Sequence, residues 1–226
     1  MESRLPASDK ALRFFSSFAE TWDSLYGRRR NALQRLLDNR LRRDIYERYA
    51  WTLERLPETL EGKTVLDVGC GSGVYCFEAA RRGAREVIGL DGAPGMIAVA
   101  QRRVRELRLE AACRFVELNF PPDDAAAIPA CDYVIVMGVM DYIADAAGFL
   151  RALRRHAKSL ALLSFPGAHW LRAPLRRYRY KLLGRCEVYN YDEDIIRALC
   201  AAAGFLQVEI VRLDHSGVCY LVAACP

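Results

Sequence analysis

The sequence of 226 residues predicts an α/β fold, with a doubly wound, mostly parallel sheet of seven strands and an antiparallel last strand. Three observations lead to this prediction. From Lys63 onward, short apolar runs alternate with patterns of helical periodicity, which is typical of a parallel sheet covered on both faces. The first apolar run ends in a turn with three glycines. The last two runs follow one another without a helix between them, which indicates an antiparallel pair.

Apolar runs and helical patterns give the expected elements in order. We expect strands near 64–68, 86–90, 113–118, 132–137, 159–165, 206–213 and 217–224. Helical patterns fall near 73–82, 94–108, 145–157 and 192–203, with a short element around 123–128.

Residues 1–60 stand apart from this alternation. Aromatic side chains repeat at helical spacings over 9–26, and leucines step by three and four over 32–56. We therefore expect an N-terminal helical lid at 1–60, followed by the sheet domain at 61–226. An insertion at 166–191 separates the fifth strand from the next helix and is placed to cap a substrate.

Composition indicates a globular protein of ordinary character. No apolar run approaches the length of a membrane-spanning helix, and the polar N-terminus lacks the apolar region of a secretory signal, so a cytoplasmic location is expected. The eight cysteines show no zinc-ligand spacing and are expected to be buried thiols in a reducing compartment. Oligomeric state is not predicted.

The net charge of +5 is unevenly distributed, with arginines concentrated in 28–48 and 172–185. In the second stretch they alternate with aromatic residues, a pattern that can bind RNA, an anionic small molecule or a membrane surface. A solvated face of arginine-rich helices explains the same pattern. We favour an insertion that accepts a small molecule carrying a carboxylate or phosphate.

The glycine turn predicts a ligand site. Gly69, Gly71 and Gly73 follow the first strand, which is expected to end at Asp67, and glycine lets the backbone approach a ligand closely. The next helix begins at once and presents free N–H groups. Val74 stands where a dinucleotide-binding turn has its third glycine, which argues against a nicotinamide or flavin cofactor. The acidic Asp67 favours a cationic ligand.

Polar and aromatic residues end the following strands. Asp91 ends the second strand, where a carboxylate can accept both hydroxyls of a ribose. Asn119 and Phe120 follow the third strand and suit the edge and face of an adenine ring. Gly138 follows the fourth strand and again permits close approach of the backbone. Together these positions predict a nucleoside site on a Rossmann-like sheet.

Three segments resemble the successive cofactor motifs of class I S-adenosylmethionine-dependent methyltransferases. They are Asp67-Val-Gly-Cys-Gly-Ser-Gly73, Asp91-Gly-Ala-Pro-Gly-Met96 and Val136-Met-Gly-Val-Met-Asp-Tyr142. The resemblance covers about residues 60–165 closely. The stretch from Phe14 to Tyr26 is similar to small-molecule O-methyltransferases of the magnesium-protoporphyrin and ubiquinone type.

The resemblance implies S-adenosylmethionine as cofactor, with S-adenosylhomocysteine as product. It implies that Asp67, Gly69 and Gly71 hold the methionine moiety, that Asp91 holds the ribose, and that Gly138 meets the methionine end. It places the remaining cofactor contacts at Tyr26, Cys70, Gly73, Gly92, Met96, Asn119 and Phe120. Asn119 departs from the aspartate that the family often has. Met96 is equally well explained by ordinary helix packing.

For the chemical step we expect in-line methyl transfer to an acceptor, most simply to oxygen, aided by a base. Asp141 and Tyr142 follow the fourth strand and are the first candidates, although they also suit a helix N-cap with a packed aromatic ring. His169 follows the fifth strand and is the second. No metal site is predicted, and His156 and His215 are expected to be solvated.

Three other functions remain open from the sequence alone. RNA methylation is one, although nucleic acid is not our first choice of partner. A second is cyclisation or cleavage of S-adenosylmethionine itself, and a third is a non-catalytic subunit that only binds the cofactor. The acceptor cannot be named from these residues.

Overall fold

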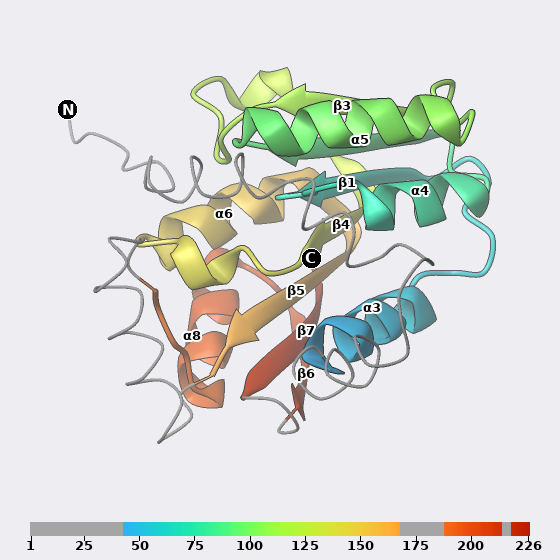
Figure 1. Cartoon of the computed structure of the whole chain (residues 1–226). Coiled ribbons are helices and arrows are strands. Elements are labelled where there is room, and N and C mark those ends of the chain that lie inside the picture. The colour runs from blue at the N-terminus through green and yellow to red at the C-terminus, as the bar shows by residue number, and fades with distance from the viewer. Residues whose placement is uncertain (1–42, 168–187, 214–217) are drawn as a thin grey trace, which may run out of the picture.

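The protein is described from a computed structural model, which defines residues 43–167, 188–213 and 218–226. One sheet of seven strands in the order β3-β2-β1-β4-β5-β7-β6 forms the centre (Figure 1). Its strands are β1 (Thr64–Val68), β2 (Glu86–Asp91), β3 (Cys113–Glu117), β4 (Cys131–Val136), β5 (Ala157–Pro166), β6 (Gln207–Leu213) and β7 (Cys219–Cys225). Strands β1 to β5 are parallel to one another, while β7 is antiparallel to both β5 and β6. The predicted fold class is confirmed.

Helices cover both faces of the sheet, and the strands divide their side chains between them. On one face α3 (Arg43–Arg55), α4 (Val74–Arg81) and α5 (Pro94–Glu106) pack against Val65 and Leu162, among others. On the other face α6 (Ala146–His156) and α8 (Glu193–Ala203) pack against Leu66 and Leu163. Neighbours in sequence thus face opposite cores, because side chains alternate along a strand. This explains why the strands read as continuous apolar runs.

The topology fixes where a ligand can bind. From β1 the chain moves to β2 on one side and later returns to β4 on the other, so the winding direction reverses between β1 and β4. Leu66 of β1 pairs with Ile88 of β2 and with Val134 of β4, which brings the carboxyl ends of all three strands to one edge. A ligand crevice is expected at such a reversal.

Most predicted boundaries agree with the structure within two residues. The short element near 123–128 is a 3₁₀ turn, η1 (Ala125–Ala127). Of the long pattern at 32–56, the described part is the helix α3. The pattern at 9–26 and most of the insertion lie outside the described residues, so the division at residue 60 stays a prediction. Among the described helices, none has the length and apolar character needed to cross a membrane.

One expectation about the helices was wrong. His156 is 4% exposed, although its arginine-rich surroundings suggested a solvated side chain. It ends α6 and packs edge-on against Phe120, with its ring centroid 5.7 Å from that of the phenyl ring. Burial, with the nearby charge of Arg155, lowers the pKa of His156, so the imidazole is a neutral core residue. His215 lies outside the described residues.

Candidate functional site

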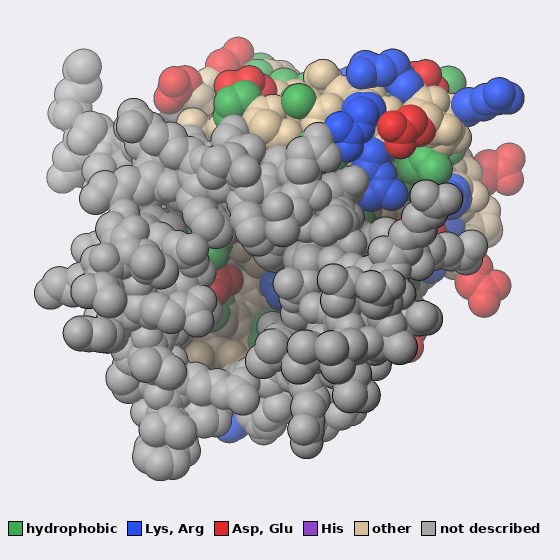
Figure 2. Space-filling model, viewed as in Figure 1, with side chains coloured by type: hydrophobic (Ala, Val, Ile, Leu, Met, Phe, Trp, Pro, Cys, Tyr) green, Lys and Arg blue, Asp and Glu red, His purple; other side chains and the backbone are tan. Residues whose placement is uncertain are grey.

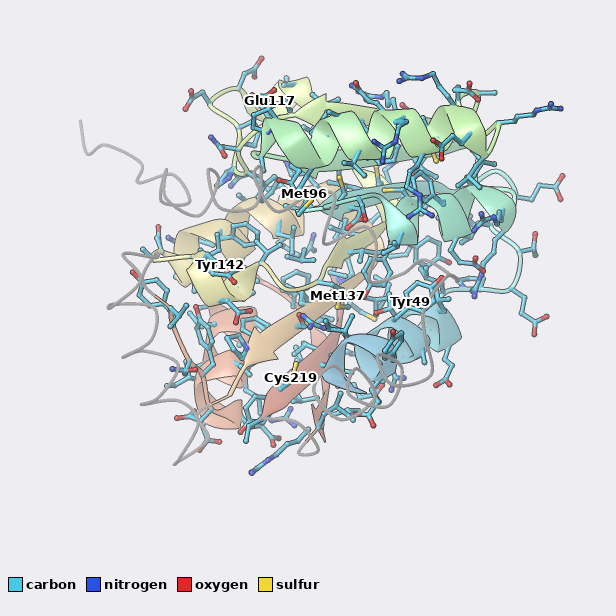
Figure 3. All side chains as sticks on the ribbon, viewed as in Figure 1. Tyr49, Met96, Glu117, Met137, Tyr142 and Cys219 are labelled. Atoms are coloured by element: carbon cyan, nitrogen blue, oxygen red, sulfur yellow. The ribbon has the colours of Figure 1, made fainter. Side chains whose placement is uncertain are left out.

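The strand ends that carry the described site residues lie along one edge of the sheet. In Figure 3, Glu117, Met96, Met137 and Cys219 follow one another across the molecule in the order of the strands that they belong to or adjoin. Tyr142 lies beside this line, in the turn after β4. The site is therefore built from strand ends and the turns that follow them, as the topology requires.

Asp91 joins the first two of these turns. Its carboxylate accepts a hydrogen bond from the N–H of Gly71 at 2.9 Å and another from the N–H of Ala93 at 2.8 Å. Burial raises the pKa of Asp91, and these two backbone hydrogen bonds act in the opposite direction. Each carboxylate oxygen can accept more than one hydrogen bond, so both can also accept from the hydroxyls of a ribose.

The glycine turn is held against β2 and against the turn after β4. The N–H groups of Gly69 and Cys70 both donate to the carbonyl of Leu90, at 2.7 and 2.9 Å. Gly69 has φ +73°, and a Cβ on it would lie 2.3 Å from Cγ2 of Val139. No larger residue fits at this contact unless the Val139 side chain or the turn shifts. The strand before it, β1, ends at Val68, the end of the predicted range 64–68.

Asp67 lies beneath the turn. It is 1% exposed, and the Cys76 thiol donates to its carboxylate at 3.4 Å. Burial raises the pKa of Asp67 to about 7, helped by the nearby charge of Asp91 and opposed by the thiol. Because Asp67 is buried, an ammonium group can contact this carboxyl group only from inside the site. The five described buried cysteines agree with the predicted thiols, whereas Cys219 and Cys225 are half-buried.

Gly138 begins the turn after β4 and is tied to β5 and α3. Its N–H donates to the Ser164 hydroxyl at 2.8 Å, and Nη1 of Arg48 approaches the same hydroxyl at 3.4 Å. Gly138 has φ +75°, and a Cβ there would lie 3.0 Å from the Arg48 guanidinium. A fixed cation thus stands at the ends of β4 and β5.

Residues on the predicted adenine side differ in their surroundings. Met96 is buried on α5, and Asn119 is exposed beyond β3. The Phe120 ring packs edge-on against Phe149 with centroids 5.1 Å apart, and against His156. Packing against α6 already accounts for this ring, so its contact with adenine stays a prediction. The same holds for the predicted roles of Gly73 and Gly92.

Asp141 and Tyr142 lie in the 3₁₀ turn η2 (Met140–Tyr142). The N-cap of α6 is Asp145, whose carboxylate accepts from the N–H of Gly148 at 2.8 Å. The interpretation of Asp141 as the helix cap is therefore wrong. Its carboxylate is near enough to Tyr191 to contribute to the raised pKa of that phenol, after burial. Both turn residues are half-buried and lie beside the Gly138 backbone in sequence.

Two predicted site residues, Tyr26 and His169, lie outside the described residues. Sequence reasoning in turn missed Arg48, Ser164 and Ser72. Ser164 carried a usable signal, since it is a single polar residue near the end of a buried apolar strand. Arg48 carried none, because it is one of many arginines in its stretch of the chain.

Known proteins share this arrangement. A family model described as a methyltransferase domain matches residues 65–159. The chain is 34% identical over 177 residues to a ubiquinone biosynthesis O-methyltransferase of Methylocella silvestris, covering 73% of this chain and 64% of that relative. These matches support a class I S-adenosylmethionine-dependent methyltransferase. The resemblance found from the motifs is confirmed.

Two further comparisons concern magnesium-protoporphyrin methyltransferases. The chain is 37% identical over 91 residues to the O-methyltransferase of Rhodobacter capsulatus, covering 40% of this chain and 38% of the relative. The crystal structure of the Synechocystis magnesium protoporphyrin IX methyltransferase with bound SAM aligns with a TM-score of 0.70 at 21% identity, covering 100% and 99% of the two chains. At this identity the alignment concerns the fold. The chain spans less than two thirds of the length of both curated relatives.

The described surface of this chain is of mixed charge. Figure 2 shows basic side chains over the region of α5, with acidic ones beside them. Among the described residues, ion pairs join Arg82 to Glu78 at 3.2 Å, Arg102 to Glu106 at 3.6 Å and Arg114 to Glu86 at 3.1 Å. This surface gives the RNA alternative no support. No group of three metal-ligating side chains is present within the described ranges, and independence from a metal stays a prediction.

Proposed function

We propose that this chain transfers the methyl group of S-adenosylmethionine to a hydroxyl oxygen of a small molecule, with S-adenosylhomocysteine as the second product. One observation carries the proposal. The Asp91 carboxylate joins the glycine turn to β2 at the strand reversal, where a ribose would be bound. The named activities of the curated relatives support the same class of reaction.

The described residues fit this cofactor. Gly69 and Gly138 provide a backbone cradle that side chains would fill. The Ser72 hydroxyl is 1% exposed and finds no hydrogen-bond partner among the described residues, so a polar ligand atom in the turn would satisfy it. Arg48 would pair with the methionine carboxylate, and Asp91 would accept from the ribose. The cofactor, when bound, supplies an electrophilic methyl group on a positively charged sulfur.

The protein's own contribution to the reaction is positioning and removal of a proton. The turns after β1 and β4 hold the methionine end, and the ends of β4 and β5 face the acceptor. A hydroxyl becomes a better nucleophile as it loses its proton, so a carboxylate near it accelerates transfer. Asp141 is the described carboxylate that we assign to this role, with Tyr142 beside it as a contact for the acceptor.

We further propose that the acceptor carries an anionic group in addition to the hydroxyl. The arginines at 172–185 support this, because they precede 188–191, which returns the chain to the strand ends. Two binding groups would then fix the acceptor, with its anionic end at the arginines and its hydroxyl at Asp141. We also propose a cytoplasmic location, which suits the free thiols of the described cysteines.

A single labelling experiment tests the proposed function. The protein is incubated with S-adenosylmethionine labelled in the methyl group. Three separate reactions also contain 3,4-dihydroxybenzoate, a small-metabolite extract or total RNA. We expect label in a small molecule from 3,4-dihydroxybenzoate or the extract, and none in the RNA. Label only in RNA, or methylthioadenosine formed without any acceptor, would overturn the proposal. Asp91→Ala controls for chemistry that does not depend on the site.

A further inference from the structure

Residues 189–191 lie against the end of β5 and the turn that follows β4. The N–H of Tyr191 donates to the carbonyl of Pro166 at 2.8 Å, and Tyr191 forms an isolated parallel bridge with Gly167. The N–H of Tyr189 donates to the carbonyl of Asp141 at 2.9 Å. Three residues therefore link the end of β5 to the turn that carries the proposed proton acceptor.

The Tyr191 side chain strengthens this link. It is 8% exposed, and its ring packs edge-on against Phe165 with centroids 5.2 Å apart and an angle of 79° between the ring planes. Its hydroxyl donates to the carbonyl of Met140 at 3.4 Å. Burial, followed by the charge of Asp141, raises the pKa of Tyr191 to about 12. The phenol therefore remains a neutral donor, and it is unsuited to act as the base itself.

The turn η2 is held from two sides. Met140 is fully buried in the core shared by β4, β5 and α6, which anchors the turn from within. Tyr189 and Tyr191 hold its backbone from outside, at the carbonyls of Asp141 and Met140. Inside the turn, the N–H of Tyr142 donates to the carbonyl of Val139 at 2.9 Å. Loss of the outer contacts would remove two of the hydrogen bonds that hold the backbone of this turn.

We propose that Tyr191 is a positioning residue that fixes the Asp141 carboxylate where the acceptor hydroxyl loses its proton. This inference rests on the proposed function. In the step it serves, the acceptor oxygen forms a bond to the methyl carbon as the bond from that carbon to sulfur breaks. The electron pair of the broken bond stays on sulfur, and the hydroxyl proton passes to Asp141. Tyr191 acts through the turn and exchanges no proton.

Hydrogen exchange tests the positioning directly. Tyr191→Phe removes the hydroxyl and keeps the ring, and Tyr220→Phe is a matched control, because Tyr220 is 6% exposed and lies on β7. We expect amides of residues 139–142 to exchange roughly tenfold faster in Tyr191→Phe alone, the equivalent of one lost hydrogen bond. Equal exchange in both variants and the wild type would overturn the inference. This readout needs no turnover, so failure of the proposed function appears separately, as a wild type that transfers no methyl group.

Turnover with 3,4-dihydroxybenzoate tests the link to Asp141. We expect Tyr191→Phe to lower kcat about tenfold with the KM for S-adenosylmethionine unchanged. If Tyr191 acts through Asp141, the double variant with Asp141→Asn is no slower than Asp141→Asn alone. The deficit of both variants should shrink toward pH 10, where a phenol ionises without help. Additive losses, or a deficit independent of pH, would show a merely structural role.

Discussion

Replacement of Gly69 by alanine separates two reasons for a glycine in the cofactor turn. Gly69 has φ +73°, and an added Cβ would lie 2.3 Å from Cγ2 of Val139. Gly62 has almost the same backbone angle, φ +71°, but an added Cβ would meet no atom within 4 Å. An alanine at either position costs roughly 1–2 kcal/mol for the left-handed conformation. Only Gly69→Ala adds about 1–3 kcal/mol for the collision with Val139.

We therefore expect Gly69→Ala to lose about 1–3 kcal/mol more unfolding free energy than Gly62→Ala, as measured by urea denaturation. Because the strained turn would move away from Val139, S-adenosylmethionine should bind at least about tenfold more weakly by calorimetry in this variant. Gly62→Ala should bind S-adenosylmethionine with the affinity of the wild type. Equal losses of stability, or unchanged cofactor affinity in Gly69→Ala, would refute the reasoning.

Three further predictions concern charges and hydrogen bonds at the site. The pKa of Asp67 is raised to about 7 from a usual 3.8, so the folded protein keeps this proton longer than the unfolded chain does. The stability contributed by Asp67 thus falls as the pH rises from about 4 to 7, on the order of 3 kcal/mol, and Asp67→Asn should lack this loss in urea denaturation at pH 4.5 and 7.5. An equal change of unfolding free energy with pH in the wild type and Asp67→Asn would contradict this prediction. Arg48→Gln should weaken calorimetric binding of S-adenosylmethionine roughly 10–100-fold and leave binding of its decarboxylated analogue unchanged, since the guanidinium pairs with the carboxylate. An equal effect on both ligands would exclude this pairing. Ser164→Ala removes the acceptor of the Gly138 N–H and should lower the unfolding free energy by about 1–3 kcal/mol, whereas the exposed Ser159→Ala should change it little. A loss no larger than the control's would contradict the assignment.

Local sequence patterns were sufficient for the elements and for the acidic strand end. The strands are continuous apolar runs because both faces of the sheet are covered, and the turn glycines and Asp91 lie at the ends of two of them. The sequence therefore predicted which edge of the sheet binds a ligand, and the structure confirms that Asp91 and the glycine turn meet there.

Contacts between distant segments were beyond these patterns. Arg48 reaches Ser164 across 116 positions of sequence, and no local pattern distinguishes it from the arginines around it. His156 looked solvated because of its arginine neighbours, yet the loop carrying Phe120 covers it. Asp141 suited an N-cap in the sequence, but the backbone course gives the cap of α6 to Asp145. In each case tertiary packing outweighs the local signal.

Binding of S-adenosylmethionine by two aspartate variants tests the central claim most directly. Asp91 and Asp132 each accept hydrogen bonds from two donors, but Asp91 lies at the carboxyl edge of the sheet and Asp132 at the start of β4, bonded to Thr64. In calorimetric titrations we expect Asp91→Ala to bind S-adenosylmethionine at least about 100-fold more weakly than the wild type, through loss of charged hydrogen bonds. Asp132→Ala should bind it with wild-type affinity. Unchanged affinity in Asp91→Ala, or an equal loss in both variants, would contradict a cofactor site at this edge.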